Sequence, residues 1–382
     1  MNKLFQSAAI ILFASTLFIL QTAAAATAVP APPKVNAAAY LVSDFDSGEL
    51  LVAENVDVKI EPASLTKIMT VYVVAAELAA GNIKLDDQVL VSEAAWRMEG
   101  SRMFIEVGKQ ISVHDLLLGA IIQSGNDASV ALAEHVAGSE EVFAGLMNQH
   151  AERLGMKNTH FMNSTGLPHE EHYTTARDMA LLGAALIQDF PDIYAMHSMK
   201  EFTYNNIRQI NRNRMLWWDE TADGIKTGHT ENAGFCLVAS AVREGMRLIS
   251  VVVGAESDNA RAKATQSILN YGFRFFETRR VYPAGGEVSA VKVWKGASEQ
   301  LRLGVAQDLY LTIPRGRFDE LDAVITPEEA IAAPIEKGAV KGSLRISLDG
   351  KLLAERPLQA LEGVPEGSLF KRLQDEFRLL IE

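Results

Sequence analysis

The spacing of apolar positions changes along the chain, and each change predicts a different kind of element. Residues 39–55 are typical of two strands joined by a tight turn. From residue 63 to about residue 189, apolar residues recur at helical spacing. Within that region Ser139, and Thr175 together with Asp178, are placed to begin two of the helices. We therefore expect a β-hairpin followed by a largely helical region.

Two continuous apolar runs rich in valine and isoleucine, residues 234–242 and 247–255, follow the helical region. Runs of this length and composition are typical of central strands that are buried on both faces. Together with the N-terminal hairpin they predict one antiparallel sheet covered by helices, in a domain that spans residues 27–278. Cys236, the single cysteine of the chain, lies in the first run and is expected in the core, so no internal disulfide can form.

The helical pattern disappears after about Arg279, and apolar and polar residues then alternate with a period of two. This alternation predicts a small all-β domain over residues 279–365. The last segment, residues 366–382, predicts an amphipathic helix. Its apolar face is formed by Leu369, Phe370, Leu373, Phe377, Leu380 and Ile381. The predicted fold class is therefore α+β: an antiparallel sheet flanked by helices, then a small all-β domain and a C-terminal amphipathic helix.

The composition is that of a globular protein, with 48% apolar and 22% charged residues among 382. The formal net charge of -12 argues against a general affinity for nucleic acid or for anionic lipid. Residues 1–26 resemble a secretory signal peptide, because Lys3 precedes an apolar run over residues 8–20 and then small residues. A permanent transmembrane anchor is the alternative, but this run is shorter than the roughly 20 residues that a span needs. We therefore expect an exported protein.

Three short motifs follow one another in the first domain. They are Ser64-x-x-Lys67, Ser124-Gly125-Asn126 and Lys226-Thr227-Gly228. Taken singly, each has an ordinary structural explanation, as a helix N-cap, a loop and a turn at a strand edge. Ser-x-x-Lys recurs at residues 289–292 and 368–371 and Ser-x-Asn at residues 257–259, whereas Lys-Thr-Gly occurs once. The ordered set of three, behind a signal peptide, is what indicates a serine enzyme.

The first two motifs have the residue types that activate a serine. A serine hydroxyl is a poor nucleophile unless a base lies beside it. Helical geometry places Ser64 and Lys67, three residues apart, on one surface. Partial burial and a second cation, Lys226, would lower the pKa of Lys67 so that it can take the hydroxyl proton near neutral pH. Ser124 can then relay a proton to a leaving amine, and Asn126 can bind a substrate amide.

The third motif can hold a substrate in place. The backbone N–H groups of Ser64, at a helix start, and of His229, on a strand, can donate to a developing oxyanion. Gly228 would let a substrate backbone approach closely and lie alongside as an added strand. Lys226 and Thr227 are expected to face a substrate carboxylate.

Around these motifs the sequence resembles the penicilloyl-serine transferases, and closely the low-molecular-mass penicillin-binding proteins that are D-alanyl-D-alanine carboxypeptidases. The likeness extends through EPASLTKIMT, QSGNDASVALAEHVAGS, TARDMALLG, RQINRN, DGIKTGHT and YGFRFFET, so it covers nearly the whole chain after the signal. It implies that Ser64 forms an acyl-enzyme, with Lys67 as its base. It also implies that Arg261 helps to bind a terminal carboxylate and that Arg212 lies at the edge of the site.

The same resemblance implies a substrate and a location. Members of this family trim the terminal D-alanine from peptidoglycan pentapeptide stems, and β-lactams acylate the same serine because they resemble that dipeptide. No metal, cofactor or nucleic acid is implied, and the nearest pair of histidines, His169 and His172, is expected in a solvated loop. The protein is expected at the periplasmic face of the bacterial inner membrane, with residues 368–382 lying in the membrane interface. Packing of that helix against its own protein is the alternative.

Two other functions remain open for this fold. A serine β-lactamase of class A uses a further glutamate to activate the deacylating water, and no Glu-x-x-Leu-Asn type segment occurs between Asn126 and Lys226. A non-catalytic envelope protein that binds peptidoglycan stems should have lost at least one motif, and this chain retains all three. The sequence does not decide between carboxypeptidase, endopeptidase and weak transpeptidase activity, because all three share the acyl-enzyme.

Overall fold

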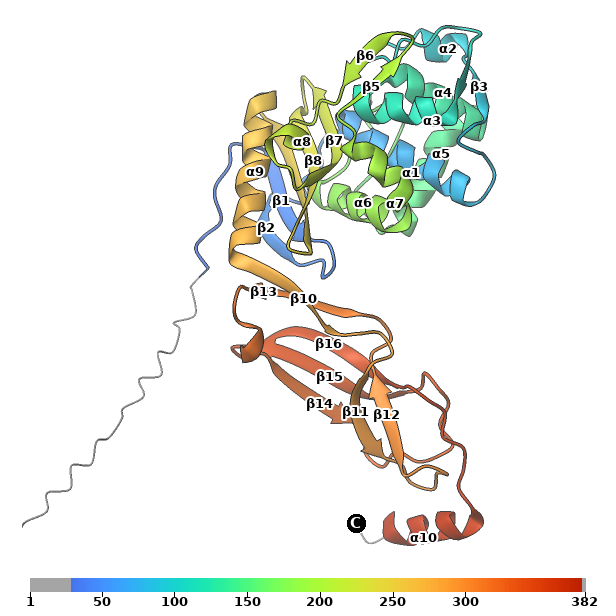
Figure 1. Cartoon of the computed structure of the whole chain (residues 1–382), viewed down its shortest axis with the longest axis vertical. Helices are drawn as coiled ribbons and strands as arrows, with labels where there is room; N and C mark the ends of the chain where they lie inside the picture. Colours follow the sequence, from blue (N-terminus) through green and yellow to red (C-terminus); the bar gives the residue numbers. More distant parts are fainter. Residues whose placement is uncertain (1–28, 380–382) are drawn as a thin grey trace, which may run out of the picture.

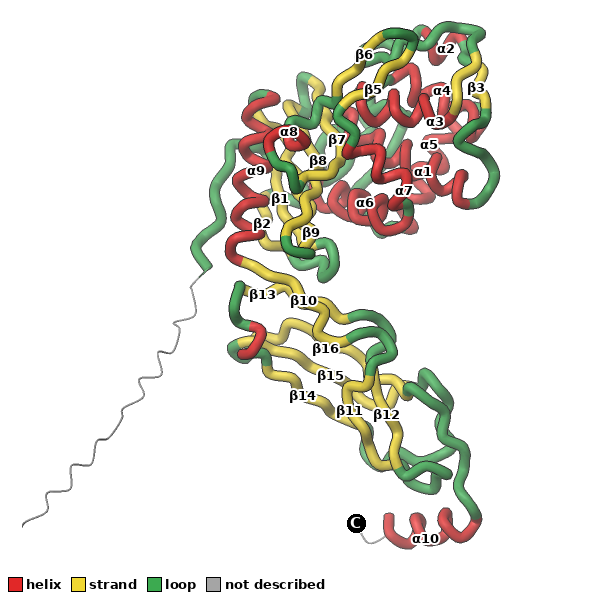
Figure 2. Tube along the Cα trace, in the orientation of Figure 1, coloured by secondary structure: helices red, strands yellow, loops and turns green. Residues whose placement is uncertain are grey.

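The computed structural model describes residues 29–379, and the predicted signal peptide lies outside this range. The described chain forms two domains stacked along the long axis of the molecule, with a short helix beyond the second domain (Figure 1). Helices make up much of the first domain, whereas strands and the loops between them make up the second (Figure 2). The predicted α+β fold class is confirmed.

A five-stranded antiparallel sheet lies in the middle of the first domain, in the order β2-β1-β9-β8-β7. Its strands are β1 (Ala39–Asp44), β2 (Leu50–Glu54), β7 (Ala222–Thr230), β8 (Gly234–Arg243) and β9 (Met246–Ala255). The N-terminal hairpin pairs with β9 and closes the sheet, as predicted, and β7 forms the opposite edge. Cys236 is fully buried in β8, which confirms its place in the core.

Helices cover both faces of this sheet and enclose two hydrophobic cores. On one face, α9 (Asp258–Phe275) packs against β8 and β9. On the other face, α6 (Ala176–Asp189) packs against β9 and against α1 (Thr66–Ala79). Helix α1 in turn packs against α4 (Asn126–Ala137) and α5 (Glu140–Arg153). The shorter helical elements are η1 (Ala63–Leu65), α2 (Glu93–Trp96), α3 (Val113–Leu118), the π-helical turn η2 (Gly119–Gln123), α7 (Pro191–Tyr194), η3 (Ala195–Ser198) and α8 (Met215–Trp218).

The predicted caps begin their helices, although one differs in detail. The hydroxyls of Ser139 and Thr175 each accept the backbone N–H three residues further on, at 3.2 and 3.1 Å. The capping box expected at Thr175 is incomplete, because the Asp178 carboxylate instead accepts from Asn158 N and Thr159 Oγ1. Asp178 therefore fixes the preceding loop rather than the helix start.

Two short hairpins are present that the sequence did not predict. They are formed by β3 (Gln88–Leu90) with β4 (Gln110–Ser112), and by β5 (Glu201–Tyr204) with β6 (Ile207–Ile210). The first of them lies inside residues 63–189, where helices nevertheless predominate as expected, and the second lies beyond that region. Strands of three or four residues are too short for a period-two pattern to stand out.

The second domain consists of strands around its own hydrophobic core, which confirms the all-β prediction. β10 (Phe276–Tyr282) continues directly from α9 and pairs with β13 (Leu309–Pro314). A five-stranded sheet follows in the order β11-β12-β16-β15-β14. Its strands are β11 (Glu287–Lys292), β12 (Gln300–Gly304), β14 (Asp322–Pro327), β15 (Val340–Leu348) and β16 (Lys351–Ala360), and η4 (Phe318–Glu320) lies between β13 and β14 in the chain.

Three hydroxyls and one carboxylate join the two domains. Thr278 Oγ1 donates to Asp44 Oδ2 at 2.6 Å and lies 2.7 Å from Thr312 Oγ1. Ser47 Oγ lies 2.6 Å from the same Thr312 hydroxyl. Because Asp44 is buried, water competes little for these bonds, and they hold the N-terminal hairpin against the second domain.

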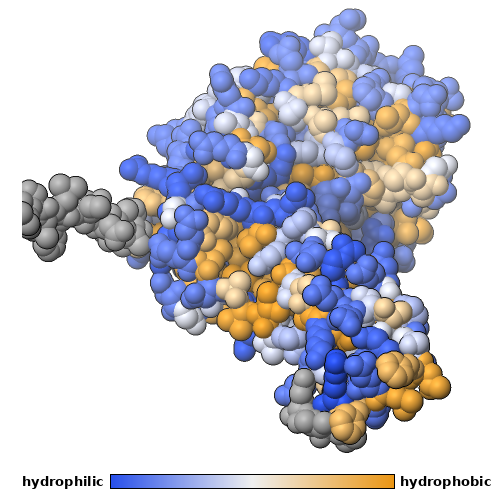
Figure 3. Space-filling view, turned by 60° about the horizontal axis from the view of Figure 1, so that its bottom comes forward, coloured by the Kyte–Doolittle hydropathy of each residue, from blue (hydrophilic) through white to orange (hydrophobic). Residues whose placement is uncertain are grey.

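The C-terminal helix α10 (Leu369–Leu379) lies at the end of the second domain that is far from the first (Figure 1). Its polar side binds the domain: the buried Asp375 carboxylate accepts the Lys295 N–H at 2.7 Å, and Lys371 Nζ contacts Glu299 at 2.9 Å. Its apolar side chains form an exposed patch at the tip of the molecule (Figure 3), in which Leu369, Phe370, Leu373 and Phe377 are 63–80% exposed. The helix thus packs against its own protein through its polar side, as the alternative states, while its apolar side stays exposed. In residues 29–379, no helix combines the length and the hydropathy needed to cross a bilayer.

Candidate active site

The Ser64 hydroxyl and the Lys67 ammonium lie side by side at the start of α1. Ser64 belongs to η1 and Lys67 to the first turn of α1, and this spacing brings Lys67 Nζ to 3.3 Å from Ser64 Oγ. Leu65, Ile68 and Met69 are fully buried and anchor the helix start in the core. The two polar groups are therefore held on a rigid element.

Three acceptors surround the completely buried Lys67. Besides contacting Ser64 Oγ, its Nζ donates to Asn126 Oδ1 at 2.7 Å and to the carbonyl of Thr165 at 2.6 Å. An ammonium has three N–H donors, so each donor has one acceptor here. The side chain is fixed from three directions, and its orientation toward Ser64 does not depend on a ligand.

Burial is the main influence on the pKa of Lys67. Loss of hydration disfavours the ammonium and lowers this pKa to about 7. The carboxylates of Asp127 and Glu140 raise it, whereas the Arg212 guanidinium lowers it. Arg212 is thus a cation that lowers the pKa of Lys67 and that the sequence did not suggest. Burial first, and then the charge of Lys67, lower the pKa of Lys226 itself.

Ser124 and Asn126 are held where the chain leaves η2. Ser124 adopts the left-handed conformation, with φ +63°, which is uncommon for a residue other than glycine. Lys226 Nζ donates to Ser124 Oγ at 2.9 Å. Asn126 donates its backbone N–H to the Ser101 carbonyl at 2.7 Å and its Nδ2 to the Glu99 carbonyl at 2.6 Å. The second motif is therefore bound both to β7 and to the loop after α2.

The third motif lies within the edge strand β7. Lys226 and Thr227 are 3% and 5% exposed, so they are buried strand residues rather than part of a turn. A Cβ at Gly228 would lie 3.2 Å from Leu65 Cγ and 3.3 Å from the Pro62 carbonyl. Besides the substrate approach expected from the sequence, this glycine thus allows the start of α1 to lie directly against β7.

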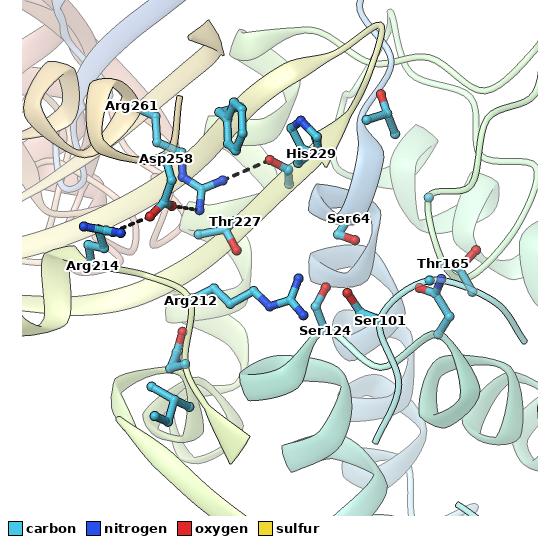
Figure 4. A pocket seen from close by; sticks show the side chains of 18 of the residues that line it. Ser64, Ser101, Ser124, Thr165, Arg212, Arg214, Thr227, His229, Asp258 and Arg261 are labelled. Atoms are coloured by element: carbon cyan, nitrogen blue, oxygen red, sulfur yellow. Dashed lines mark hydrogen bonds and ion pairs between the residues drawn. The ribbon is translucent and has the colours of Figure 1, made fainter. Parts of the chain in front are cut away.

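The two arginines near the site have different surroundings. Arg261 is 5% exposed, donates to the Gly228 carbonyl at 3.1 Å and pairs with Asp258. Arg212 is exposed, and its guanidinium points toward Ser124 (Figure 4). Within residues 29–379, Arg212 forms no hydrogen bond or ion pair. Arg261 therefore supports β7, whereas Arg212 is available to a ligand.

A pocket of about 710 Å³ brings the predicted residues together (Figure 4). Its lining includes Ser64, Ser124, Asn126, Arg212, Thr227, Gly228, His229 and Arg261. Lys67 and Lys226 are buried directly behind this lining, where they contact Ser64 and Ser124. The exposed His229 ring packs on Phe235, with 4.1 Å between the ring centroids. All ten residues predicted from the sequence thus lie in or directly behind one pocket.

Other residues contribute contacts that the motifs do not reveal. Thr165 and Glu99 act through backbone carbonyls, which every residue has and which therefore leave no mark in a sequence. Ser101 and Trp217 line the pocket wall. Asp127 carries a detectable signal, because it directly follows Ser-Gly-Asn and a carboxylate in an apolar helix needs partners.

One histidine of the expected solvated loop is buried. His169 is exposed, but His172 is 2% exposed and its Nε2 lies 2.9 Å from Thr66 Oγ1. Burial lowers the pKa of His172 to about 4, so the ring is neutral at physiological pH. His172 contacts the first turn of α1 through Thr66, and its ring packs edge-on against the buried Phe161. Among the residues from 29 to 379, no group of three or more His, Cys, Asp or Glu side chains is placed to hold a metal ion.

Comparisons with known proteins agree with this geometry. A family model described as D-alanyl-D-alanine carboxypeptidase matches residues 25–257, and one described as the C-terminal domain of penicillin-binding protein 5 matches residues 276–366. The carboxypeptidases DacC and DacA of Escherichia coli (strain K12) are 48% and 44% identical to this chain, over 97% and 93% of its length and 93% and 90% of theirs. The crystal structure of penicillin-binding protein 5 from Haemophilus influenzae matches with a TM-score of 0.86 at 42% identity, covering 88% of this chain and 100% of that chain. The chain therefore belongs to the D-alanyl-D-alanine carboxypeptidase family.

Proposed function

We propose that this protein is a serine D-alanyl-D-alanine carboxypeptidase, which removes the terminal D-alanine from the pentapeptide stems of peptidoglycan. The observation that carries this proposal is the buried Lys67, whose Nζ lies 3.3 Å from Ser64 Oγ and whose pKa is lowered to about 7. A base with this pKa can accept the serine proton near neutral pH. β-Lactams resemble the terminal dipeptide and acylate the same serine.

In the acylation step, Ser64 Oγ attacks the carbonyl carbon of the penultimate D-alanine while its proton passes to Lys67 Nζ. The backbone N–H groups of Ser64 and His229 donate to the oxyanion that forms. The C–N bond then breaks, and the leaving D-alanine amine takes the proton of the Ser124 hydroxyl, which Ser124 regains from the Lys226 ammonium that contacts it. A water molecule then attacks the acyl-serine carbonyl and returns a proton through Ser124 to Lys226, the ester C–O bond breaks, and Ser64 Oγ regains its proton from Lys67 as the shortened stem leaves.

The stem binds in extended form beside the edge strand β7, where Gly228 leaves room for a neighbouring backbone. Thr227 and the unpaired Arg212 guanidinium are the groups that receive the terminal carboxylate. Arg261 contributes positive charge while it holds β7 in place. The Oδ1 and the Nδ2 of Asn126 both form hydrogen bonds within the protein, so the first role of this side chain is to position Lys67. A substrate amide binds to the same two atoms.

Release of free D-alanine tests this function directly. We expect release from a peptide ending in D-Ala-D-Ala and none from a matched peptide ending in D-Ala-L-Ala. A labelled penicillin should form a lasting adduct on Ser64, which peptide mapping by mass spectrometry can locate. Rapid penicillin hydrolysis without any release of D-alanine would instead favour the β-lactamase alternative. Penicillin binding without either reaction would favour a non-catalytic peptidoglycan-binding protein.

We further propose that α10 attaches the enzyme to the periplasmic face of the bacterial inner membrane. Its polar side is bound to the second domain and its apolar side is exposed, which is the arrangement that an interfacial helix needs. The many charged residues on the helix nearly balance, so burial of apolar surface rather than attraction to anionic lipid drives the binding.

Deletion of residues 368–382 should give a protein that stays in solution and keeps its activity. We expect full-length mature protein, but not the shortened protein, to sediment with phospholipid vesicles, while both release D-alanine at similar rates. Changing Phe370 and Phe377 together to glutamate should have the same effect as the deletion. Gln374→Glu is the matched control, because it adds charge to the helix without removing apolar surface. Loss of activity together with the tail would contradict a purely anchoring role.

A further inference from the structure

Asp127, which directly follows the second motif, is 1% exposed and binds four backbone N–H groups. Its Oδ1 accepts from Met103 and from Ala128, both at 2.8 Å. Its Oδ2 accepts from Phe104 at 2.9 Å and from Ile105 at 3.3 Å. A single carboxylate thus joins the first turn of α4 to the loop that follows α2.

The loop that Asp127 holds is the loop that holds Asn126. Residues 99–105 include the Glu99 carbonyl, which accepts Asn126 Nδ2 at 2.6 Å, and the Ser101 carbonyl, which accepts the Asn126 N–H at 2.7 Å. Asn126 Oδ1 in turn accepts from Lys67 Nζ. An unbroken series of hydrogen bonds therefore runs from the Asp127 carboxylate through this loop to Lys67.

The residues that form these hydrogen bonds are closely packed, so they have little freedom to move. A Cβ at Gly125 would lie 2.8 Å from Asp127 Oδ1 and 3.0 Å from Met103 N, which gives a physical reason for the glycine in Ser-Gly-Asn. Phe104 is 45% exposed and has a φ of +69°, an unfavourable conformation for a bulky residue. The bond from Phe104 N to Asp127 helps to maintain this conformation.

We propose that Asp127 is a positioning residue of the active site, which fixes Asn126 and the loop 99–105 so that Lys67 is aimed at Ser64. This role rests on the proposed function, and it adds a residue that lies outside the three motifs. Asp127 acts through Asn126 and the loop, because its own oxygens are occupied by backbone N–H groups.

The charge of Asp127 also acts on Lys67. The charged groups that influence the Lys67 ammonium are Asp127 on α4, Glu140 on α5 and Arg212, and Lys226 on β7 is in turn influenced by Lys67. Asp127 is the largest of the charges that oppose the effect of burial, so it raises the pKa of Lys67. Removing this negative charge should lower the pKa of Lys67 further.

The test is the pH dependence of penicillin acylation at Ser64 in Asp127→Asn. An amide of the same shape keeps one acceptor oxygen and turns an NH2 group toward N–H donors, so the loop should loosen. We expect the acylation rate constant at pH 8 to fall about 10- to 100-fold, because small misplacements of reacting groups are costly. We also expect the acid limb of the profile to move to lower pH, because less alkaline conditions then suffice to deprotonate Lys67.

Two further variants separate position, charge and stability. Asp127→Glu keeps the charge but moves the carboxylate, so it should lower the rate and leave the acid limb in place. Asp178→Asn is the matched control: Asp178 is also buried and binds Asn158 N at 2.9 Å and Thr159 Oγ1 at 2.7 Å, but it is not among the charges acting on Lys67. The Asp178→Asn substitution should lower Tm without altering the acylation rate constant or its dependence on pH.

Two outcomes would overturn the proposal. One is an Asp127→Asn protein with a lowered Tm, a normal acylation rate and an unmoved acid limb, which would make Asp127 merely structural. The other is an acid limb that moves to higher pH. If Asp127→Asn does not fold, the test rests on Asp127→Glu, and a normal acylation rate in that variant would also overturn the proposal. Because the readout is penicillin acylation, failure of D-alanine release would count against the proposed substrate and not against this role.

Discussion

Replacing Ser64 with alanine should abolish the release of D-alanine, with a loss in kcat of about 10⁴-fold or more. The substitution removes the only oxygen in the proposed mechanism that can form the acyl-enzyme. It should hardly affect folding, because Ser64 is half-buried and its Oγ contacts Lys67, which keeps its bonds to Asn126 and Thr165. The expected change in unfolding free energy is within about 0.5 kcal/mol.

The measurements are D-alanine release and covalent labelling by penicillin, with Tm as a check on folding. Ser289→Ala is the matched control, because Ser289 and Lys292 repeat the Ser-x-x-Lys pattern in the second domain on β11. This control should behave as wild type in all three measurements. If Ser64→Ala still releases D-alanine at more than about a hundredth of the wild-type rate, the proposed nucleophile is wrong.

Replacing Lys67 with methionine should slow acylation about 10³-fold, because the reaction then lacks its base. Wild-type acylation should rise with pH through about 7, since the pKa of Lys67 is lowered to that value and only the neutral amine can accept the serine proton. The methionine variant should lose this rise. Stopped-flow measurement of penicillin acylation between pH 5 and 9 would reveal both effects.

Two companion variants make the Lys67 prediction specific. Lys67→Arg keeps a cation that cannot lose its proton in this range, so it should be as slow as the methionine variant. Lys292→Met removes the lysine of the similar pattern in the second domain and should leave the profile unchanged. Near-wild-type acylation by Lys67→Arg would show that this position supplies charge rather than a base. The methionine variant also leaves the Asn126 and Thr165 acceptors without their donor, at a cost of about 1–3 kcal/mol each, so its Tm should be measured too.

The parts of the fold that the sequence predicts correctly are those in which a pattern repeats over many residues. The valine-rich runs 234–242 and 247–255 became β8 and β9, because long buried strands must be continuously apolar. The alternating pattern after residue 279 correctly predicted the strands of the second domain. The hairpins β3–β4 and β5–β6 were not predictable in this way, because each of their strands contains only one or two repeats of the two-residue period of a strand.

For the site, the sequence identifies side chains but not what surrounds them. Ser64 and Lys67 could be predicted to be neighbours, because three residues of helix fix their spacing. The Thr165 carbonyl that holds Lys67 comes from 98 residues further along the chain, and only the packed fold brings it there. The influence of Arg212 on the pKa of Lys67 depends on distance and burial in the same way, and so the sequence did not reveal it.

The contacts of α10 have a consequence for how the enzyme meets its substrate. Because Asp375 and Lys371 bind the second domain, the exposed apolar face has a fixed direction relative to the whole molecule. With that face in the lipid interface, as proposed, the second domain would hold the pocket at one height above the bilayer (Figure 1). The search for stems then becomes two-dimensional. Turnover would follow the number of enzyme and stem molecules per unit area of membrane rather than their concentration in the surrounding volume.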